Sequence, residues 1–415
     1  MTHLNARQLA RVLRHRDFRH LWLGQTASNV GDRLVVVALA LYVTDLTGSP
    51  TDLGLVLAAH AIPLVGFLAI GGVWADRLPR HRVMVASDLV RCVLHALLAA
   101  LIFAGAVEVW HIVVIEALFG TAEAFFRPAY TGLVPQTVPE EEIQEVNALT
   151  GFVNNLAEFV GPALATALVL GVGGGVAFAL DAATFLVSAV LLLRVRPRAR
   201  GEATVRTTVL TELREGFDAV RARAWVWVTI AVFSLALLVG LAPLFVLGPV
   251  VGDEQYGSTG VYGVWMAALG AGTVAGSVVA IRWRPRHPMR LGMLFVLLWP
   301  VSGVAFALGQ PLALVLALTV VAGAGIALFD VWWLTALAER VEPHLLSRVT
   351  SYDWMGSLAL MPLGYLLAGP VAEALGAVEV LAAGSLLALA FLAVGLLPRE
   401  TRMLERRDAV GAAAG

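Results

Sequence analysis

The chain has 415 residues, of which 59% are hydrophobic and 14% charged, and its mean hydropathy is +0.81. A soluble chain carries about 25% charged residues, so this composition argues against a soluble enzyme. The net charge is −1, without the basic excess of a nucleic-acid-binding protein, and we expect no nucleic-acid partner. All 29 basic residues are arginines, which excludes a P-loop lysine and a lysine Schiff base. The single cysteine, Cys92, can form neither an internal disulfide nor a cysteine-cluster metal site.

Twelve stretches of the chain are long and apolar enough to cross a membrane as helices. A hydrocarbon core of about 30 Å needs roughly 20 apolar residues of helix. The approximate spans are 19–43, 53–74, 82–105, 110–134, 143–170, 174–194, 225–249, 260–281, 289–308, 312–337, 347–371 and 376–397. The composition and the spans together predict an all-α integral membrane protein.

The arginines are distributed unevenly between the connections of these spans. Six alternate connections contain no arginine, whereas the other connections and the two tails hold 26 of the 29. Because arginine-rich segments remain on the cytoplasmic side, we expect a multi-pass protein of the cytoplasmic membrane with both termini in the cytoplasm. The alternation also supports the count of twelve, since one missed helix would place arginines on both sides.

A polar stretch in the middle divides the chain into two halves. Residues 195–224 form the longest polar segment, in which apolar residues recur on one helical face. This pattern is typical of an amphipathic helix on the cytoplasmic membrane surface. The predicted domains are therefore a helical bundle at 1–194, a linker at 195–224 and a second bundle at 225–415.

The two halves resemble each other. Gly161-Pro162 in the fifth span recurs as Gly369-Pro370 in the eleventh, and an arginine-rich loop follows both the second and the eighth span. A duplicated six-helix unit is a common transporter architecture, with the substrate site between the repeats. The sequence thus predicts twelve transmembrane helices in two pseudo-symmetric six-helix bundles.

Polar and charged residues inside the predicted spans are the candidate functional residues. A charge at the bilayer centre is costly and usually faces a cavity or a partner. The first, fourth and fifth spans each carry such residues at helical spacing on one face. We expect the following residues to line the substrate cavity and to take part in proton coupling: Gln25, Asn29, Asp32, Glu116, Glu123, Arg127, Glu158 and Asp330.

These polar residues also have a purely structural interpretation. Glu123 and Arg127 are spaced i, i+4 and can neutralise each other. Asp32 can pair with an arginine across the bundle, and His60 and His95 can be packing histidines. The sequence leaves both interpretations open.

An ion gradient is the predicted source of energy. Desolvation favours the neutral form of a carboxyl group, and a nearby arginine favours the charged form. An acid that alternates between such surroundings can bind a proton on one side of the membrane and release it on the other. The chain contains no HExxH, GxSxG, GxGxxG or P-loop motif, so we expect no enzyme activity, no metal and no cofactor.

One loop and four longer segments resemble a known family. The segment GVWADRLPRHR at 72–82, between the second and third spans, resembles the signature loop of the major facilitator superfamily. Finer matches resemble its siderophore-exporter and macrolide-efflux branch, namely RDFRHLWLGQTASNVGD, AFFRPAYTGLVPQTVP, LDAATFLVSAVLLL and LLSRVTSYDWMGSLALMPLGYLLAGP. The resemblance covers nearly the whole chain.

The resemblance implies the major facilitator fold, with alternating access by rocking of two six-helix bundles and a cavity lined by spans 1, 4, 7 and 10. It also implies a cytoplasmic gate that is latched by a charge relay. The family's fifth-span antiporter motif is partial here, since Gly161-Pro162 remains while Ala165 and Thr166 replace later glycines, and this remnant favours export. Many proton antiporters of the family have an arginine where this chain has Glu116, so their proton path does not carry over. The residues assigned to the gate are Gly72, Asp76, Arg77, Arg80, Asp88 and Arg91, and those assigned to the hinge are Gly161 and Pro162.

These features predict a secondary transporter that exports amphipathic drugs or related metabolites in exchange for protons. We expect it to work as a monomer in the lipid bilayer. A siderophore exporter and a lysophospholipid flippase are alternatives of the same class. An importing symporter, and a membrane sensor or scaffold that transports nothing, are alternatives of other kinds.

Overall fold

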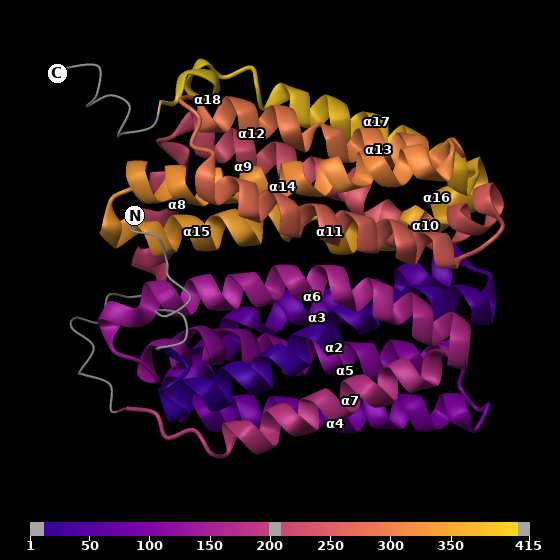
Figure 1. Cartoon of the computed structure of the whole chain (residues 1–415), viewed down its shortest axis with the longest axis horizontal. Helices are drawn as coiled ribbons and strands as arrows, with labels where there is room; N and C mark the ends of the chain where they lie inside the picture. Colours follow the sequence, from indigo (N-terminus) through magenta and orange to yellow (C-terminus); the bar gives the residue numbers. More distant parts are fainter. Residues whose placement is uncertain (1–11, 199–208, 406–415) are drawn as a thin grey trace. The chain divides into compact units, whose positions relative to one another are not determined.

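The computed structural model describes residues 12–198 and 209–405 (Figure 1). Every regular element in these two ranges is a helix, which confirms the all-α prediction. Eleven helices or joined helices among the described residues are long and apolar enough to cross a membrane. The predicted first span is not among them: it lies in α2 (Arg16–Thr47), which has 32 residues but carries the polar stripe. The chain is thus a multi-pass membrane protein, and its helices are compatible with twelve spans.

The helices form two compact units, of which the N-terminal unit comprises Met1–Gly48 and Leu55–Ala203. It contains α2 and the five helices of the next five predicted spans. The start of the second of these six helices groups with the other unit. The five helices that follow α2 are α3 (Pro50–Arg77), α4 (Arg80–Phe103), α5 (Val109–Leu133), α6 (Ile143–Val172) and α7 (Gly174–Leu192).

The second unit comprises Ser49–Gly54 and Thr204–Gly415. Its first helix, α8 (Val209–Arg221), lies in the predicted linker, and the remaining helices cover the last six predicted spans and the start of the C-terminal tail. They are α9 (Ala224–Ala236), the π-helix η3 (Leu237–Leu241), α10 (Ala242–Tyr256), α11 (Gly260–Arg282), α12 (Pro288–Val296), α13 (Leu298–Ala307), α14 (Leu312–Arg340), α15 (Pro343–Leu358), α16 (Met361–Leu375), α17 (Ala377–Val394) and α18 (Arg399–Met403).

Three predicted spans of the second unit are interrupted helices. The interruptions lie between α9 and α10, between α12 and α13, and between α15 and α16. Each time the chain resumes its helix with a proline in the first turn: Pro243, Pro300 or Pro362. Proline has no backbone N–H and its ring collides with the preceding turn, so the hydrogen-bond ladder breaks at these points.

The two units repeat one pattern of helix packing. In the N-terminal unit, α4 packs against α5 and α7, and α2 packs against α6 and α7. In the second unit the helices of the equivalent spans pair in the same way: α12 and α13 pack against α14 and α17, and α10 packs against α16 and α17. The repeated pairing agrees with two pseudo-symmetric six-helix bundles.

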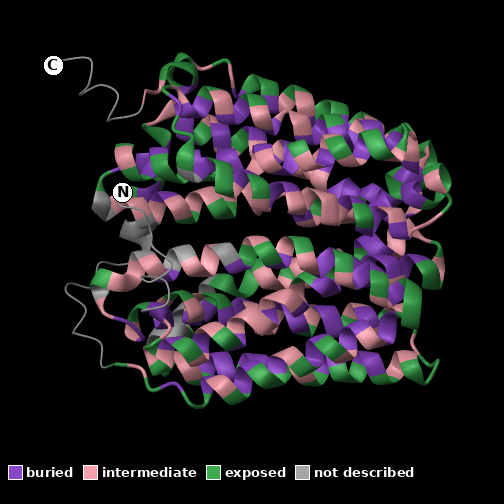
Figure 2. Cartoon of the chain, viewed as in Figure 1, coloured by how far each residue is buried: buried purple, intermediate pink, exposed green. Residues whose placement is uncertain are grey.

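The outer faces of the helices are apolar. Val90, Val93 and Leu97 lie on one side of α4 and are exposed. Figure 2 shows buried residues on the helix faces that meet within each unit and exposed residues on the faces that do not. An exposed apolar face of this kind suits contact with lipid, because the backbone of a helix satisfies its own hydrogen bonds.

Candidate functional site

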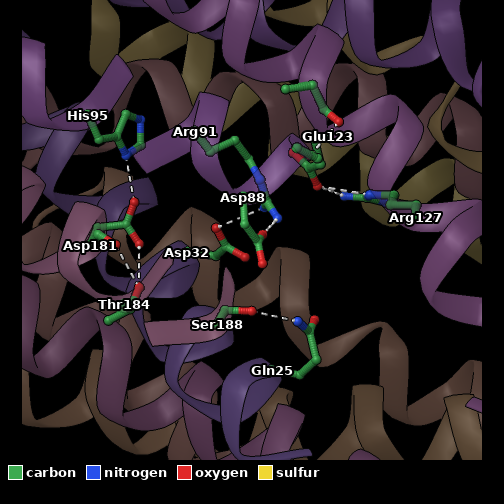
Figure 3. A network of polar contacts seen from close by, with 12 residues as sticks. Gln25, Asp32, Asp88, Arg91, His95, Glu123, Arg127, Asp181, Thr184 and Ser188 are labelled. Carbon is green, nitrogen blue, oxygen red and sulfur yellow. Dashed lines mark hydrogen bonds and ion pairs between the residues drawn. The ribbon is translucent and has the colours of Figure 1, made fainter. Parts of the chain in front are cut away.

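Among the described residues of the N-terminal unit, five titratable side chains are almost fully buried. They come from α4, α5 and α7, and their neighbours include residues of α2 and α3 (Figure 3). A buried charge destabilises the fold unless it is paired and hydrogen-bonded. The five residues are Asp88, Arg91, His95, Glu116 and Asp181.

Arg91 lies between two aspartates (Figure 3). Its Nη2 donates a hydrogen bond to Asp88 Oδ1 at 2.5 Å, and its Nη1 is 3.9 Å from Asp32 Oδ1. Its guanidinium carbon is 4.2 Å from the ring centroid of Phe185 and 4.3 Å from that of Phe126. Such aromatic faces attract a planar cation and hold it in place. The structure thus joins Asp88 and Arg91, which we assigned to the gate, to Asp32, which we assigned to the cavity.

The other buried groups belong to a chain of alternating acids and bases, which we call the histidine-bridged chain. Its outer part is built on α5 and α3. His60 Nε2 is 3.2 Å from Glu123 Oε2, and His60 Nδ1 is 3.1 Å from Glu116 Oε2. Arg127 donates to Glu123 Oε1 from Nη2 at 2.7 Å and from Nε at 2.9 Å. The members of the histidine-bridged chain, in order, are Arg127, Glu123, His60, Glu116, His95 and Asp181.

The inner part of the histidine-bridged chain is centred on His95. Its Nδ1 is 2.5 Å from Asp181 Oδ2, and its Nε2 is 3.5 Å from Glu116 Oε1. The ring of Phe119 stacks on the imidazole of His95 at a centroid distance of 4.2 Å and lies 5.6 Å from that of His60. One aromatic side chain therefore flanks both imidazoles.

Small residues let the helices that carry these groups approach one another. A Cβ at Gly120 would lie 2.1 Å from the backbone oxygen of His60, so only glycine permits this contact between α5 and α3. On α5, Gly120 lies between Glu116 and Glu123, on the same helical face. Its missing side chain therefore brings His60 between the two glutamates.

The polar stripe of α2 faces α6 and α7. Gln25 donates to Ser188 Oγ at 3.1 Å, and Asn29 donates to Asn154 Oδ1 at 2.5 Å. One helical turn after Asn29, Arg33 Nη2 pairs with Glu158 Oε1 at 3.1 Å. The predicted residues of the first and fifth spans thus meet each other along the contact between α2 and α6.

Three arginines lie well inside predicted spans, away from the span ends, and each one has an acidic partner. Arg33 pairs with Glu158, Arg91 with Asp88, and Arg127 with Glu123. Each of these intramembrane arginines is thus neutralised by an acidic partner, as expected because an unpaired charge inside the membrane has a high free-energy cost.

The other predicted gate residues are separate from this site. Arg80 Nη1 donates to the backbone oxygen of Gly132 at 2.5 Å, which ties the start of α4 to the end of α5. Arg77 is exposed at the end of α3. Gly72 and Asp76 fall within α3, but their side-chain positions lie outside what the structure describes. The proposed latch through Asp76 therefore remains a prediction.

Two further predictions concern Asp330 of the cavity and the hinge at Gly161 and Pro162. Asp330 lies on α14 in the second unit and is exposed. Gly161 of the predicted hinge packs closely on α2, since a Cβ there would lie 2.5 Å from Arg33 Cβ. Pro162 follows inside the continuous helix α6, and its backbone oxygen accepts a hydrogen bond from Thr166.

The sequence interpretation did not single out Asp181. It is the one charged residue of α7, a 19-residue helix, and this isolation is the same signal that marked the other acids. His60 and His95 had packing roles as one interpretation, yet each contacts two carboxylates. Among the described residues, no cluster of three or more His, Cys, Asp or Glu side chains is arranged to hold a metal ion.

Comparison with known proteins gives relatives named as efflux proteins. The chain is 22% identical to macrolide efflux protein A of Streptococcus pyogenes over 373 residues, which is 86% of this chain and 90% of that protein. It is 29% identical to the multidrug efflux pump Tap of Mycolicibacterium fortuitum over 368 residues, 84% of this chain and 87% of that protein.

Solved structures share the fold. The nucleoside transporter NupG aligns with a TM-score of 0.70 at 13% identity and covers 91% of this chain and 98% of its own. A bacterial homolog of the human lysosomal transporter Spinster aligns with a TM-score of 0.67 at 16% identity, over 96% of this chain and 97% of its own. The family profile of the Major Facilitator Superfamily matches residues 21–357. The chain therefore belongs to the Major Facilitator Superfamily, as its signature loop and its packing repeat indicate.

Proposed function

We propose that the protein exports small amphipathic compounds from the cytoplasm in exchange for protons. Relatives that align over most of the chain are named for macrolide efflux and multidrug efflux, which supports export of bulky, partly apolar molecules. The arginine-rich connections support a location in the cytoplasmic membrane with both termini in the cytoplasm.

The observation that carries the proton-coupling part is the position of Asp32 beside Arg91. Of the two carboxylates near this arginine, Asp88 is fully buried and hydrogen-bonded, whereas 39% of the Asp32 side chain is exposed at a distance of 3.9 Å. A proton can bind Asp32 while Arg91 keeps its bond to Asp88. Loss of that proton restores a charge that Arg91 attracts, so the acid can alternate between two stable states.

Export then follows from competition at Asp32. In the outward-open state the acid takes up a proton from the exterior, and in the inward-open state it releases the proton to the cytoplasm as the substrate binds. The proton moves down its gradient and the substrate moves out. Each half of the cycle requires that the protonated and the deprotonated form of Asp32 favour different conformations of the protein.

The test is accumulation of a probe in proteoliposomes whose interior is more acidic than the exterior. Radiolabelled erythromycin, a macrolide, and ethidium, an amphipathic cation, are suitable probes. We expect the wild type to concentrate at least one of them above the level that the same pH difference produces in protein-free vesicles, and an ionophore that collapses the pH difference to abolish this excess. Asp32→Asn removes the titratable group and should lower the excess accumulation by at least about tenfold.

Asp45→Asn is the matched control, because Asp45 is an exposed acid near the end of the same helix. It should accumulate the probes as the wild type does. Normal gradient-driven accumulation by Asp32→Asn would contradict the coupling role of Asp32.

A further inference from the structure

The histidine-bridged chain has no part in the function proposed so far. We propose that it is a proton relay, in which His60 and His95 carry protons between Glu123, at its outer end, and Asp181, in the interior of the N-terminal unit. This inference rests on the proposed proton coupling and adds the route by which protons enter the bundle.

The geometry of the two imidazoles supports a relay. Each ring contacts two different carboxylates through its two different nitrogens. His60 joins Glu123 to Glu116 at 3.2 and 3.1 Å, and His95 joins Glu116 to Asp181 at 3.5 and 2.5 Å. A packing histidine needs only one such partner. An imidazole between two carboxylates can accept a proton on one nitrogen and release one from the other.

Proton transfer along the histidine-bridged chain conserves the number of protons at every step. Protonated Glu123 gives its proton to Nε2 of His60, and the Nδ1–H of the resulting imidazolium passes its proton to Glu116. The carboxyl group of Glu116 receives this proton on Oε2, rotates and gives it to Nε2 of His95, whose Nδ1–H protonates Asp181. The net change is one proton moved from Glu123 to Asp181, with both imidazoles neutral in the opposite tautomer. Transfer in the reverse direction restores the starting state.

The two outer members of this route are partly exposed, and the three inner members are buried. The side chains of Glu123 and His60 are 16% and 26% exposed, whereas those of Glu116, His95 and Asp181 are 3%, 1% and 0% exposed. Protons can therefore be exchanged with water or substrate only at the outer end. The inner members are reached through the chain itself.

The negative charge around the imidazoles favours the binding of additional protons. Five carboxylates from α2, α4, α5 and α7 and two arginines belong to the linked contacts of this site, so three negative charges are unbalanced while both histidines are neutral. A low-dielectric interior disfavours such an imbalance, and protons on the chain reduce it. The carboxylates are those of Asp32, Asp88, Glu116, Glu123 and Asp181, and the arginines are Arg91 and Arg127.

One contact of the histidine-bridged chain is not a hydrogen bond. His95 Nε2 and Glu116 Oε1 are 3.5 Å apart, and both buried atoms lack a hydrogen-bond partner in the structure. A buried polar atom without a partner carries a free-energy penalty. A small approach of α4 and α5 would satisfy both atoms and complete the route, so this contact can switch the relay on and off.

The inner end of the relay lies against the helix that carries Asp32. A Cβ at Gly31 would lie 2.1 Å from Asp181 Oδ1, so α7 meets α2 at the residue that precedes Asp32. Protonation of Asp181 removes a negative charge at this contact. The relay thus links proton uptake at Glu123 to the surroundings of the proposed coupling acid.

The experiment compares two transport reactions of proteoliposomes with radiolabelled erythromycin as the probe. Accumulation driven by an acidic interior, taken as the excess over protein-free vesicles, needs net proton movement through the protein, whereas exchange of external label for internal erythromycin at equal pH does not. His60→Gln and Asp181→Asn keep polar side chains of similar size but remove a proton-binding group each. We expect both variants to lose at least about tenfold in accumulation while exchange stays within about twofold of the wild type.

His15→Gln is the matched control, because His15 pairs with Glu142 at 2.8 Å outside the histidine-bridged chain. It should match the wild type in both reactions. The relay is overturned if His60→Gln and Asp181→Asn accumulate erythromycin normally. It is also overturned if they lose exchange together with accumulation, since the residues would then serve the fold or substrate binding.

The wild type separates this inference from the proposed function. If the wild type exchanges erythromycin but shows no accumulation in the pH gradient, proton coupling itself is contradicted, and the relay with it. If only the variants fail to accumulate the probe, both proposals stand.

Discussion

Arg91 is the buried cation that pairs with the acidic side chains of α2 and α4 in the N-terminal unit. It is 2% exposed, it is bonded to Asp88, and its guanidinium group lies against Phe126 and Phe185. A guanidinium group is planar and weakly hydrated, whereas an ammonium group is compact and strongly hydrated. The position therefore requires an arginine rather than a positive charge of any shape.

Arg91→Lys should lower the free energy of unfolding by about 1–3 kcal/mol, because the lysine keeps the charge but loses the stacking on the two aromatic rings and the Nη2 hydrogen bond to Asp88. The measurement is the midpoint of thermal unfolding in detergent. Arg127→Lys is the control, since 52% of the Arg127 side chain is exposed. Equal midpoints for Arg91→Lys and the wild type would show that the aromatic contacts contribute nothing.

At the residue scale, the spacing of residues along one helix predicted the contacts within that helix. Contacts between residues of different helices could not be predicted from the sequence. The pair of Glu123 and Arg127 follows directly from i, i+4 spacing, and the structure contains it. The contacts of His60 with α5 depend on how closely two helices approach, which no spacing within one helix encodes. Asp181 could have been found as an isolated intramembrane acid, but its partner His95 could not.

At the scale of elements, α5 organises the site. Its residues 116, 120 and 123 lie on one face, with a glycine between two glutamates. The glycine admits the backbone of α3, and the glutamates then hold the imidazole that α3 supplies. A change in the distance between these two helices therefore breaks two contacts of the histidine-bridged chain at once.

Gly120→Ala should separate α3 from α5, because its Cβ would lie 2.1 Å from a backbone oxygen that cannot rotate away. Overpacking of this kind costs about 1–3 kcal/mol. We expect a lower unfolding midpoint and slower probe transport, both measured on the purified variant. Gly66→Ala on α3 is the control, since nothing lies within 4 Å of a Cβ there, and it should leave both values unchanged. An unchanged midpoint for Gly120→Ala would rule out the close contact.

Helix positions were predictable from hydropathy, whereas helix interruptions were not. The membrane-spanning stretches can be recognised because a helix of about 20 predominantly apolar residues matches the thickness of the hydrocarbon core. Proline alone does not predict a break, because Pro63, Pro128 and Pro162 lie inside the continuous helices α3, α5 and α6. Neighbouring helices decide whether the unpaired backbone groups beside a proline are satisfied, and that information is not local.

At the scale of the whole molecule, the sequence predicted the duplication and the structure repeats it in helix packing. The Gly-Pro motif and the arginine-rich loops marked equivalent spans, and equivalent helices pack in the same pairs. The substrate could not be predicted, because an amphipathic cargo is recognised by shape and apolar contact rather than by a motif. Asp330 and the acids of the N-terminal unit share a chain but lie in different units.

Proton antiport requires substrate and protons to move in opposite directions, and the decisive measurement is the proton movement that a substrate gradient drives. Proteoliposomes with equal pH on both sides and a trapped pH-sensitive dye receive erythromycin from outside. Erythromycin is a weak base that also binds protons after entering protein-free vesicles, so proton antiport predicts that the interior becomes more alkaline than in protein-free vesicles, and that Asp32→Asn abolishes this difference. Entry of labelled erythromycin with the same interior pH as in protein-free vesicles, or with a more acidic one, would contradict the account.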